Sequence, residues 1–135
     1  MDRQAQELGV ADCVEFIGAT ADVPGLLENS RFLVHTSDTE GCPNAVMEAM
    51  ACGRPVVAMD AGDIPFLVED GRTGFVVRRE DEATFAERVF QLLTDNELCR
   101  RMGLAARAKA EQEFGLDSLV TETLNAYRAA GWRDS

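Results

Sequence analysis

Two carboxylates at a fixed spacing give this chain its clearest chemical feature. Glu40 and Glu48 stand eight positions apart, one before a short expected helix and one inside it. The free backbone N–H groups at the start of that helix lie between them, where they and the helix dipole favour a phosphate group. Carboxylates accept hydrogen bonds from hydroxyl groups. The spacing therefore suits a ligand that joins a phosphate to a polyol.

The residues around the two glutamates predict the elements that hold them. An apolar run at 32–36 is typical of a strand, and Pro43 suits the start of a helix that runs to Cys52. Gly53 ends the helix, and a second apolar run at 56–59 predicts another strand. Ser37 would then end the first of these two strands, where ligands bind in open α/β sheets.

The rest of the chain alternates short apolar runs with helical patterns, which predicts an α/β fold with a parallel sheet. Further strands are expected at 14–17 and 74–77, and short helices at 1–8, after Asp22 and at 64–69. From Asp81 the apolar period becomes helical. We expect Asp95 to cap the next helix, Gly115 to break it, and the last helix to start at Asp117 or Ser118.

Length and composition predict a single domain over residues 1–135. The net charge of −11 argues against nucleic acid and against an anionic membrane surface as partners. No apolar run is long enough to span a membrane and no signal-peptide pattern opens the chain, so a cytoplasmic location is expected. A phosphate site in so acidic a chain needs local positive potential.

The cysteines predict neither a metal site nor a disulfide framework. They show no metal-ligand spacing, and reduced thiols are expected. A bridge between Cys42 and Cys52 is not expected, because it would tie the two ends of one helix. The four cysteines are Cys13, Cys42, Cys52 and Cys99.

Four sequence blocks together resemble the retaining GT-B glycosyltransferases of the glycosyl transferases group 1 family. They are Val14-Glu-Phe-Ile-Gly18 and the segments 32–37, 40–58 and 69–77, in that family's order and spacing. The resemblance covers residues 9–127. It implies a Rossmann-like parallel sheet flanked by helices, the C-terminal half of a GT-B donor-binding domain lacking its first strands, and helical from about residue 81.

The resemblance also assigns roles to the two glutamates. Glu48 would accept hydrogen bonds from the ribose of a nucleotide diphosphate-sugar, and Glu40 would be the catalytic-site carboxylate beside the donor sugar. The alternatives are a salt-bridged helix glutamate at Glu48 and a solvated loop carboxylate at Glu40. Gly41 follows Glu40, and a glycine lets the backbone approach a ligand closely.

The neighbouring residues complete the expected donor site. Backbone N–H groups of Cys42, Asn44 and Ala45 would donate to the phosphates, since Pro43 has no N–H. The Ser37 hydroxyl would either reach a phosphate or cap its own turn. Gly18 would lie where the family's base-binding loop begins, although a plain turn explains a glycine there equally well. A nucleophilic role for Cys42 lacks a base nearby in sequence.

One residue near the expected site receives no functional role, and two others depart from the family's usual pattern. His35 lies inside an apolar strand, and we interpret it as a packed strand residue. The family usually has a second glycine where this chain has Asp63, and a glutamate where it has Phe66. Both departures fall near the expected donor phosphates and the acceptor side.

The resemblance implies a hexosyltransferase-type activity with a nucleotide diphosphate-sugar as substrate and no metal cofactor. The family's glycine-rich loop with its Arg and Lys, and its acceptor-binding domain, have no counterpart here, so the chain alone is expected to be incomplete and inactive. The alternative is a non-catalytic oligomeric remnant or interaction module. An epimerase or phosphorylase of the same fold matches these blocks less well.

The missing strands raise a question about the sheet. With strand order 3-2-1-4-5-6, the two absent strands belong between the strand at 14–17 and the strand at 32–36. Either these two pair directly or another chain fills the gap. The sequence therefore predicts a homodimer, a rearranged sheet, or a missing N-terminal domain as partner.

Overall fold

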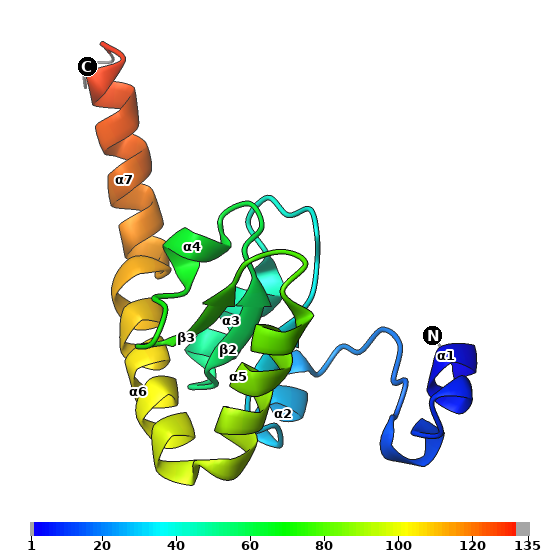
Figure 1. Ribbon diagram of the computed structural model, residues 1–135. Helices are drawn as coiled ribbons and strands as arrows, with labels where there is room; N and C mark the ends of the chain where they lie inside the picture. The colour runs from blue at the N-terminus through cyan, green and yellow to red at the C-terminus, as the bar shows by residue number, and fades with distance from the viewer. Residues whose placement is uncertain (1, 132–135) are drawn as a thin grey trace.

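The computed structural model describes residues 2–131 and contains a three-stranded parallel sheet in the order β1-β2-β3. The strands are β1 (Leu33–His35), β2 (Val56–Met59) and β3 (Gly74–Val77), with helices on both sides (Figure 1). All pairs are parallel, so the carboxyl ends of the strands meet at one edge of the sheet. The expected α/β fold with a parallel sheet is confirmed.

Both faces of the central strand β2 are buried. Val56 and Ala58 belong to a cluster with α3 (Asn44–Ala51) and the carboxyl half of α6 (Asn96–Glu113), while Val57 packs against α5 (Glu82–Thr94) and the amino half of α6. Successive side chains on a strand point to opposite faces. An unbroken apolar run is what a strand covered on both faces requires.

Aspartate caps begin three of the helices. The side chains of Asp22, Asp81 and Asp95 accept hydrogen bonds from backbone N–H groups at the starts of α2 (Val23–Glu28), α5 and α6. These bonds satisfy N–H groups that have no partner inside the helix. The expected caps at Asp22 and Asp95 are confirmed, and the short helix α4 (Ile64–Leu67) stands within its expected range.

The prediction of a strand at 14–17 is wrong, because the structure has no strand there. Residues 14–18 have no regular secondary structure, pair with no strand and do not close onto β1. Val14, Phe16 and Ile17 remain 41–49% exposed. A strand-like sequence forms a strand only beside a partner with free N–H and C=O groups, and none lies next to this segment.

The first residues form an arm that stands away from the sheet. Its elements are α1 (Asp2–Glu7) and η1 (Ala11–Cys13), joined to the body through the segment between η1 and α2 (Figure 1). The helix expected at 1–8 is present as α1, and Met1 lies outside the described residues.

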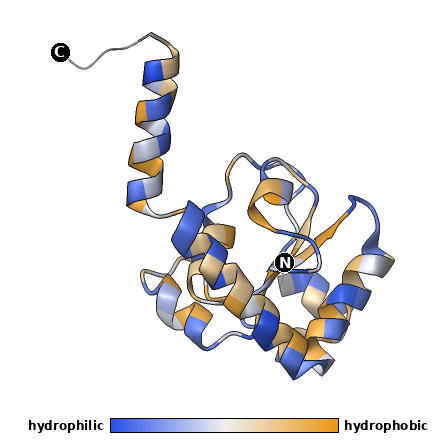
Figure 2. Ribbon diagram, turned by 90° about the vertical axis from the view of Figure 1, so that its left-hand side faces the viewer, coloured by the Kyte–Doolittle hydropathy of each residue, from blue (hydrophilic) through white to orange (hydrophobic). Residues whose placement is uncertain are grey.

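The last helix, α7 (Leu116–Ala129), projects from the body and has no buried residue (Figure 2). Gly115 separates α6 from α7 as expected. The helix α7 starts at Leu116, one residue before the earlier of the two predicted starts. The helical part from about residue 81 is confirmed by α5, α6 and α7.

Candidate functional site

The candidate site lies at the carboxyl edge of the sheet, in the loops that follow β1 and β2. The first loop, residues 36–43, carries Glu40 and leads into α3. The second, residues 60–63, leads into α4. The strands direct both loops to the same edge, which is where open α/β sheets bind ligands.

Glu40 is held by a histidine. Nε2 of His35, the last residue of β1, lies 3.1 Å from Oε1 of Glu40, and the two side chains are only 16% and 24% exposed. The sequence interpretation of His35 as a packed strand residue missed this contact. The signal was present in the sequence, since a strand end and the loop five residues later both belong to the expected site edge.

A close contact between the two loops fixes the backbone beside Glu40. A Cβ atom at Gly62 would lie 2.0 Å from the carbonyl oxygen of Glu40, and Gly62 has φ +53°. The Asp63 N–H donates to the carbonyl of Gly41 at 3.1 Å. Asp63 has φ −84°, which any residue adopts, so an aspartate fits where the family usually has a second glycine.

The start of α3 offers free backbone donors. Pro43 occupies the N-cap position, with no side-chain cap and no acidic residue in the first turn. The first N–H groups of α3 that donate a hydrogen bond within the helix are those of Val46 and Met47, and both donate to the Pro43 carbonyl. The N–H groups of Asn44 and Ala45 belong to the first turn of α3, where N–H groups have no acceptor inside the helix.

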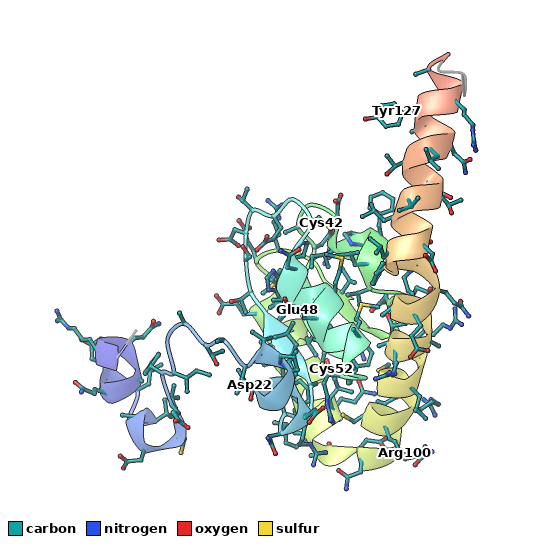
Figure 3. The ribbon with its side chains drawn as sticks, turned by 180° about the vertical axis from the view of Figure 1, so that it is seen from behind. Asp22, Cys42, Glu48, Cys52, Arg100 and Tyr127 are labelled. Atoms are coloured by element: carbon teal, nitrogen blue, oxygen red, sulfur yellow. The ribbon has the colours of Figure 1, made fainter. Side chains whose placement is uncertain are left out.

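Glu48 is an exposed carboxylate on α3 with no ion pair or side-chain hydrogen bond among residues 2–131. Figure 3 shows it midway between Cys42 and Cys52, which lie at opposite ends of the helix. It stands four residues after Asn44, about 6 Å along the helix axis. A cavity of about 180 Å³ lined by Val23, Pro24, Leu27, Glu48, Ala51 and Cys52 opens beside it.

Three further candidate residues have the following surroundings. The Ser37 hydroxyl donates to the carbonyl of Thr39 at 3.2 Å, so it caps its own turn. The Cys42 thiol lies 3.9 Å from the sulfur of Met47, and no base contacts it among the described residues. Gly18, with φ +64°, belongs to the segment between η1 and α2, which joins the arm to the body (Figure 1).

Positive charge reaches this edge through Arg79, whose Nε donates to the carbonyl of Asp60 at 2.8 Å. Asp60 directly follows β2. No group of three or more His, Cys, Asp or Glu side chains within residues 2–131 is arranged to hold a metal ion. No helix of the described chain is long and apolar enough to cross a membrane.

A separate cavity of about 310 Å³ lies at the opposite, amino edge of the sheet, lined in part by Arg31, Arg54 and Cys99. Arg31 donates to the carbonyls of Leu92 and Leu93, so this guanidinium binds the end of a helix. Burial raises the pKa of the Cys99 thiol, against a smaller lowering by the two arginines. This cavity lies apart from the glutamates.

The parallel sheet flanked by helices is part of a C-terminal domain of the GT-B fold. Residues 1–95 match the family described as glycosyl transferases group 1, and the chain belongs to that family.

Similar proteins agree with this assignment. The chain is 36% identical over 132 residues to a D-inositol 3-phosphate glycosyltransferase from Streptomyces scabiei, covering 96% of this chain and 29% of that protein. It is 33% identical over 122 residues to an N-acetyl-alpha-D-glucosaminyl L-malate synthase from Bacillus anthracis, covering 90% of this chain and 32% of that protein. The chain thus spans about a third of the length of the curated relatives it matches.

A solved structure shows the same fold. The crystal structure of Anabaena Alr3699/HepE in complex with UDP and glucose superimposes with a TM-score of 0.84 and 32% identity. The match covers 92% of this chain and 35% of that one.

Proposed function

We propose that residues 1–135 form part of the nucleotide-sugar-binding domain of a retaining glycosyltransferase, which transfers a sugar from a nucleotide diphosphate-sugar to an acceptor hydroxyl. The observation that carries the proposal is the combination of an open helix start, a histidine-held Glu40 and an exposed Glu48 that has no side-chain partner within residues 2–131. The UDP and glucose in the similar Anabaena structure support the ligand class.

Each group has a separate task in this proposal. Glu48 accepts hydrogen bonds from the ribose hydroxyls, and the cavity beside it takes the apolar part of the nucleoside. The N–H groups of Asn44 and Ala45 donate to the diphosphate, with the helix dipole favouring its charge. Glu40 contacts the donor sugar beside Gly41. The leaving diphosphate is stabilised electrostatically, which asks for no metal.

Transfer belongs to the longer protein in this proposal. The chain spans about a third of its relatives, and a retaining enzyme of this fold works in a cleft between two domains. Residues 1–135 alone would bind the donor weakly and transfer nothing. Arg79 supplies positive charge at the site edge.

A ligand titration with Glu48→Gln tests the proposal. We expect UDP, GDP or ADP and their sugars to shift the amide resonances of residues 41–48, and the variant to weaken binding about tenfold or more, since a hydrogen bond to a charged group contributes about 1.5–3 kcal/mol. The matched control is Glu87→Gln, an exposed glutamate on α5. Equal affinities for the wild type and Glu48→Gln would exclude the ribose role.

The second candidate is a non-catalytic module of the same fold. Phe66, at the position where the family usually has a glutamate, is 77% exposed, and it places an apolar side chain on α4 where a polar one is expected. The same titration separates the two functions. The absence of any shift at millimolar ligand would mean a binding free energy weaker than about −4 kcal/mol. That result would favour the non-catalytic module.

A further inference from the structure

We propose that His35 is a positioning residue that holds the Glu40 carboxylate against the sugar part of the donor and so strengthens binding of the sugar rather than of the nucleotide. This inference rests on the proposed function. It goes beyond that function because it assigns a role to the single histidine of the chain.

The fold places the imidazole where it can reach the loop. Leu33 and His35 are two positions apart on β1 and therefore share one face. Leu33 packs against the cluster that contains α3, so His35 lies on the side of the sheet that α3 covers. From this side its Nε2 reaches Oε1 of Glu40 at 3.1 Å.

The backbone and the side chain of Glu40 are fixed by different contacts. The close approach of Gly62 and the bond from the Asp63 N–H to the Gly41 carbonyl hold the loop. Neither contact restrains the carboxylate. Within residues 2–131, His35 is the only residue that hydrogen-bonds to the Glu40 side chain.

The chemistry of the pair sets the direction of the hydrogen bond. An ionised carboxylate can only accept, so the proton lies on Nε2 of His35 and is donated to Oε1. Oε2 of Glu40 then remains available to accept a hydrogen bond from a sugar hydroxyl. A long, flexible side chain is thus ordered before the ligand arrives, which lowers the entropy cost of binding.

The expected effect is confined to the sugar. Ordering one flexible side chain in advance corresponds to about three- to tenfold in affinity. We therefore expect His35→Phe, which keeps a ring but removes the donor, to weaken binding of UDP-glucose by that factor and to leave binding of UDP unchanged. His35→Gln, whose amide can donate to Oε1, restores most of the loss.

The experiment measures both affinities by calorimetry on the full chain for the wild type, His35→Phe, His35→Gln, Glu40→Ala and the double variant His35→Phe/Glu40→Ala. The double variant is expected to lose no more than Glu40→Ala alone, because the histidine acts only through the glutamate. Asp38→Ala, an exposed carboxylate of the same loop, is the matched control and should change neither affinity.

Two results overturn the inference. One is an equal loss of UDP and UDP-glucose affinity in His35→Phe without rescue by glutamine, which indicates a general role in folding. The other is additive loss in the double variant.

If the wild type binds neither ligand, the proposed function fails, and ¹⁵N spectra of the imidazole then decide the inference separately. A proton on Nε2 that is lost or shifted in Glu40→Ala, with new mobility of residues 37–41 in His35→Phe, supports the positioning contact. An unchanged ring and loop refute it.

Discussion

Glu40 and Glu48 have the same side chain but different surroundings, and the difference follows from their positions. The Glu40 side chain contacts His35 at the end of β1, while Glu48 is exposed on α3 and has no ion pair or side-chain hydrogen bond among the residues that the structure describes. A protein gains little stability from an unpartnered surface carboxylate. The two residues should therefore respond differently to substitution, with Glu48 affecting ligand binding and not folding.

Gly62 is the residue on which the loop geometry depends most directly. We predict that Gly62→Ala lowers the free energy of unfolding by about 2 kcal/mol or more, because the new Cβ would overlap the Glu40 carbonyl oxygen and a positive φ is also unfavourable for alanine. Urea unfolding monitored by circular dichroism measures the change.

The matched control is Gly71→Ala. Gly71 has φ +76° but no atom within 4 Å of the added Cβ, so only the backbone strain of about 1 kcal/mol remains. If the two variants were equally stable, the close contact between the loops would carry no energetic weight.

At the scale of elements, the helices were the most predictable part of this chain. Their starts rest on local chemistry, an aspartate side chain accepting from an N–H three residues later, as at Asp81 and Thr84. The core strands were predictable from their short apolar runs, and β2 and β3 match their expected ranges. Both signals lie within a few neighbouring residues.

The contacts that the sequence could not predict are those between distant elements. The guanidinium of Arg31 reaches carbonyls at the end of α5, and the guanidinium of Arg107 donates to the carbonyl of Ala51 at the end of α3. The strand expected at 14–17 failed because pairing depends on a neighbour, not on the segment itself. In the candidate site, the spacing singled out Glu40 and Glu48 as candidates, and the His35 contact required the fold.

Lys109, the only lysine, shows how a long-range contact connects two elements. Its amine lies 3.2 Å from Glu69, in the turn after α4, and 3.2 Å from Glu113 on its own helix, and the side chain is 11% exposed. The hydrogen bond from Arg72, and next that from Lys109, lower the pKa of Glu69 from its usual 4.5.

The lowered pKa predicts a pH dependence of stability. Glu69 stabilises the fold above its unfolded pKa of 4.5, where it is ionised in both states, and this contribution is lost as the pH falls through the lower folded pKa. We expect Arg72→Ala and Lys109→Met each to raise the pKa of Glu69, with the larger rise in Arg72→Ala.

Titration of the carboxyl carbon resonance by NMR measures these pKa values. Arg100→Ala, which removes the partner of Glu97 on the same helix as Lys109, is the control and should leave Glu69 unchanged. A Glu69 pKa that stays the same in both variants would show that the two contacts are not formed in solution.

At the scale of the whole molecule, exposed apolar side chains lie on many elements, and three places among them are candidates for contact with another chain. They are the arm before residue 22, the free edge of β1 and the helix α7 (Figures 1 and 2). Val34 on β1 is 44% exposed, and Leu119 and Tyr127 on α7 are 63% and 58% exposed. The outer edge of β3 is different, because the Asp70 carboxylate accepts from the Val76 N–H and occupies it.

The free edge of β1 predicts self-association of the isolated chain. An unpaired strand presents N–H and C=O groups in a row, and another chain can pair with them. We expect the chain to form dimers at tens of micromolar, and Val34→Lys to make it monomeric, since a lysine on an edge strand opposes pairing. Phe90→Lys is the control, because Phe90 is a 65% exposed apolar residue on a helix, α5, and not on this strand.

Light scattering coupled to size-exclusion chromatography, over a hundredfold range of concentration, separates the outcomes. Dimers lost in Val34→Lys and kept in Phe90→Lys would place the contact at the β1 edge. Dimers that persist in both would move it to the arm or to α7, where paired substitutions at Phe16 or Leu119 would then be compared. A wild-type chain that stays monomeric at every concentration would refute pairing between copies. We would then propose that another part of a longer enzyme covers the β1 edge.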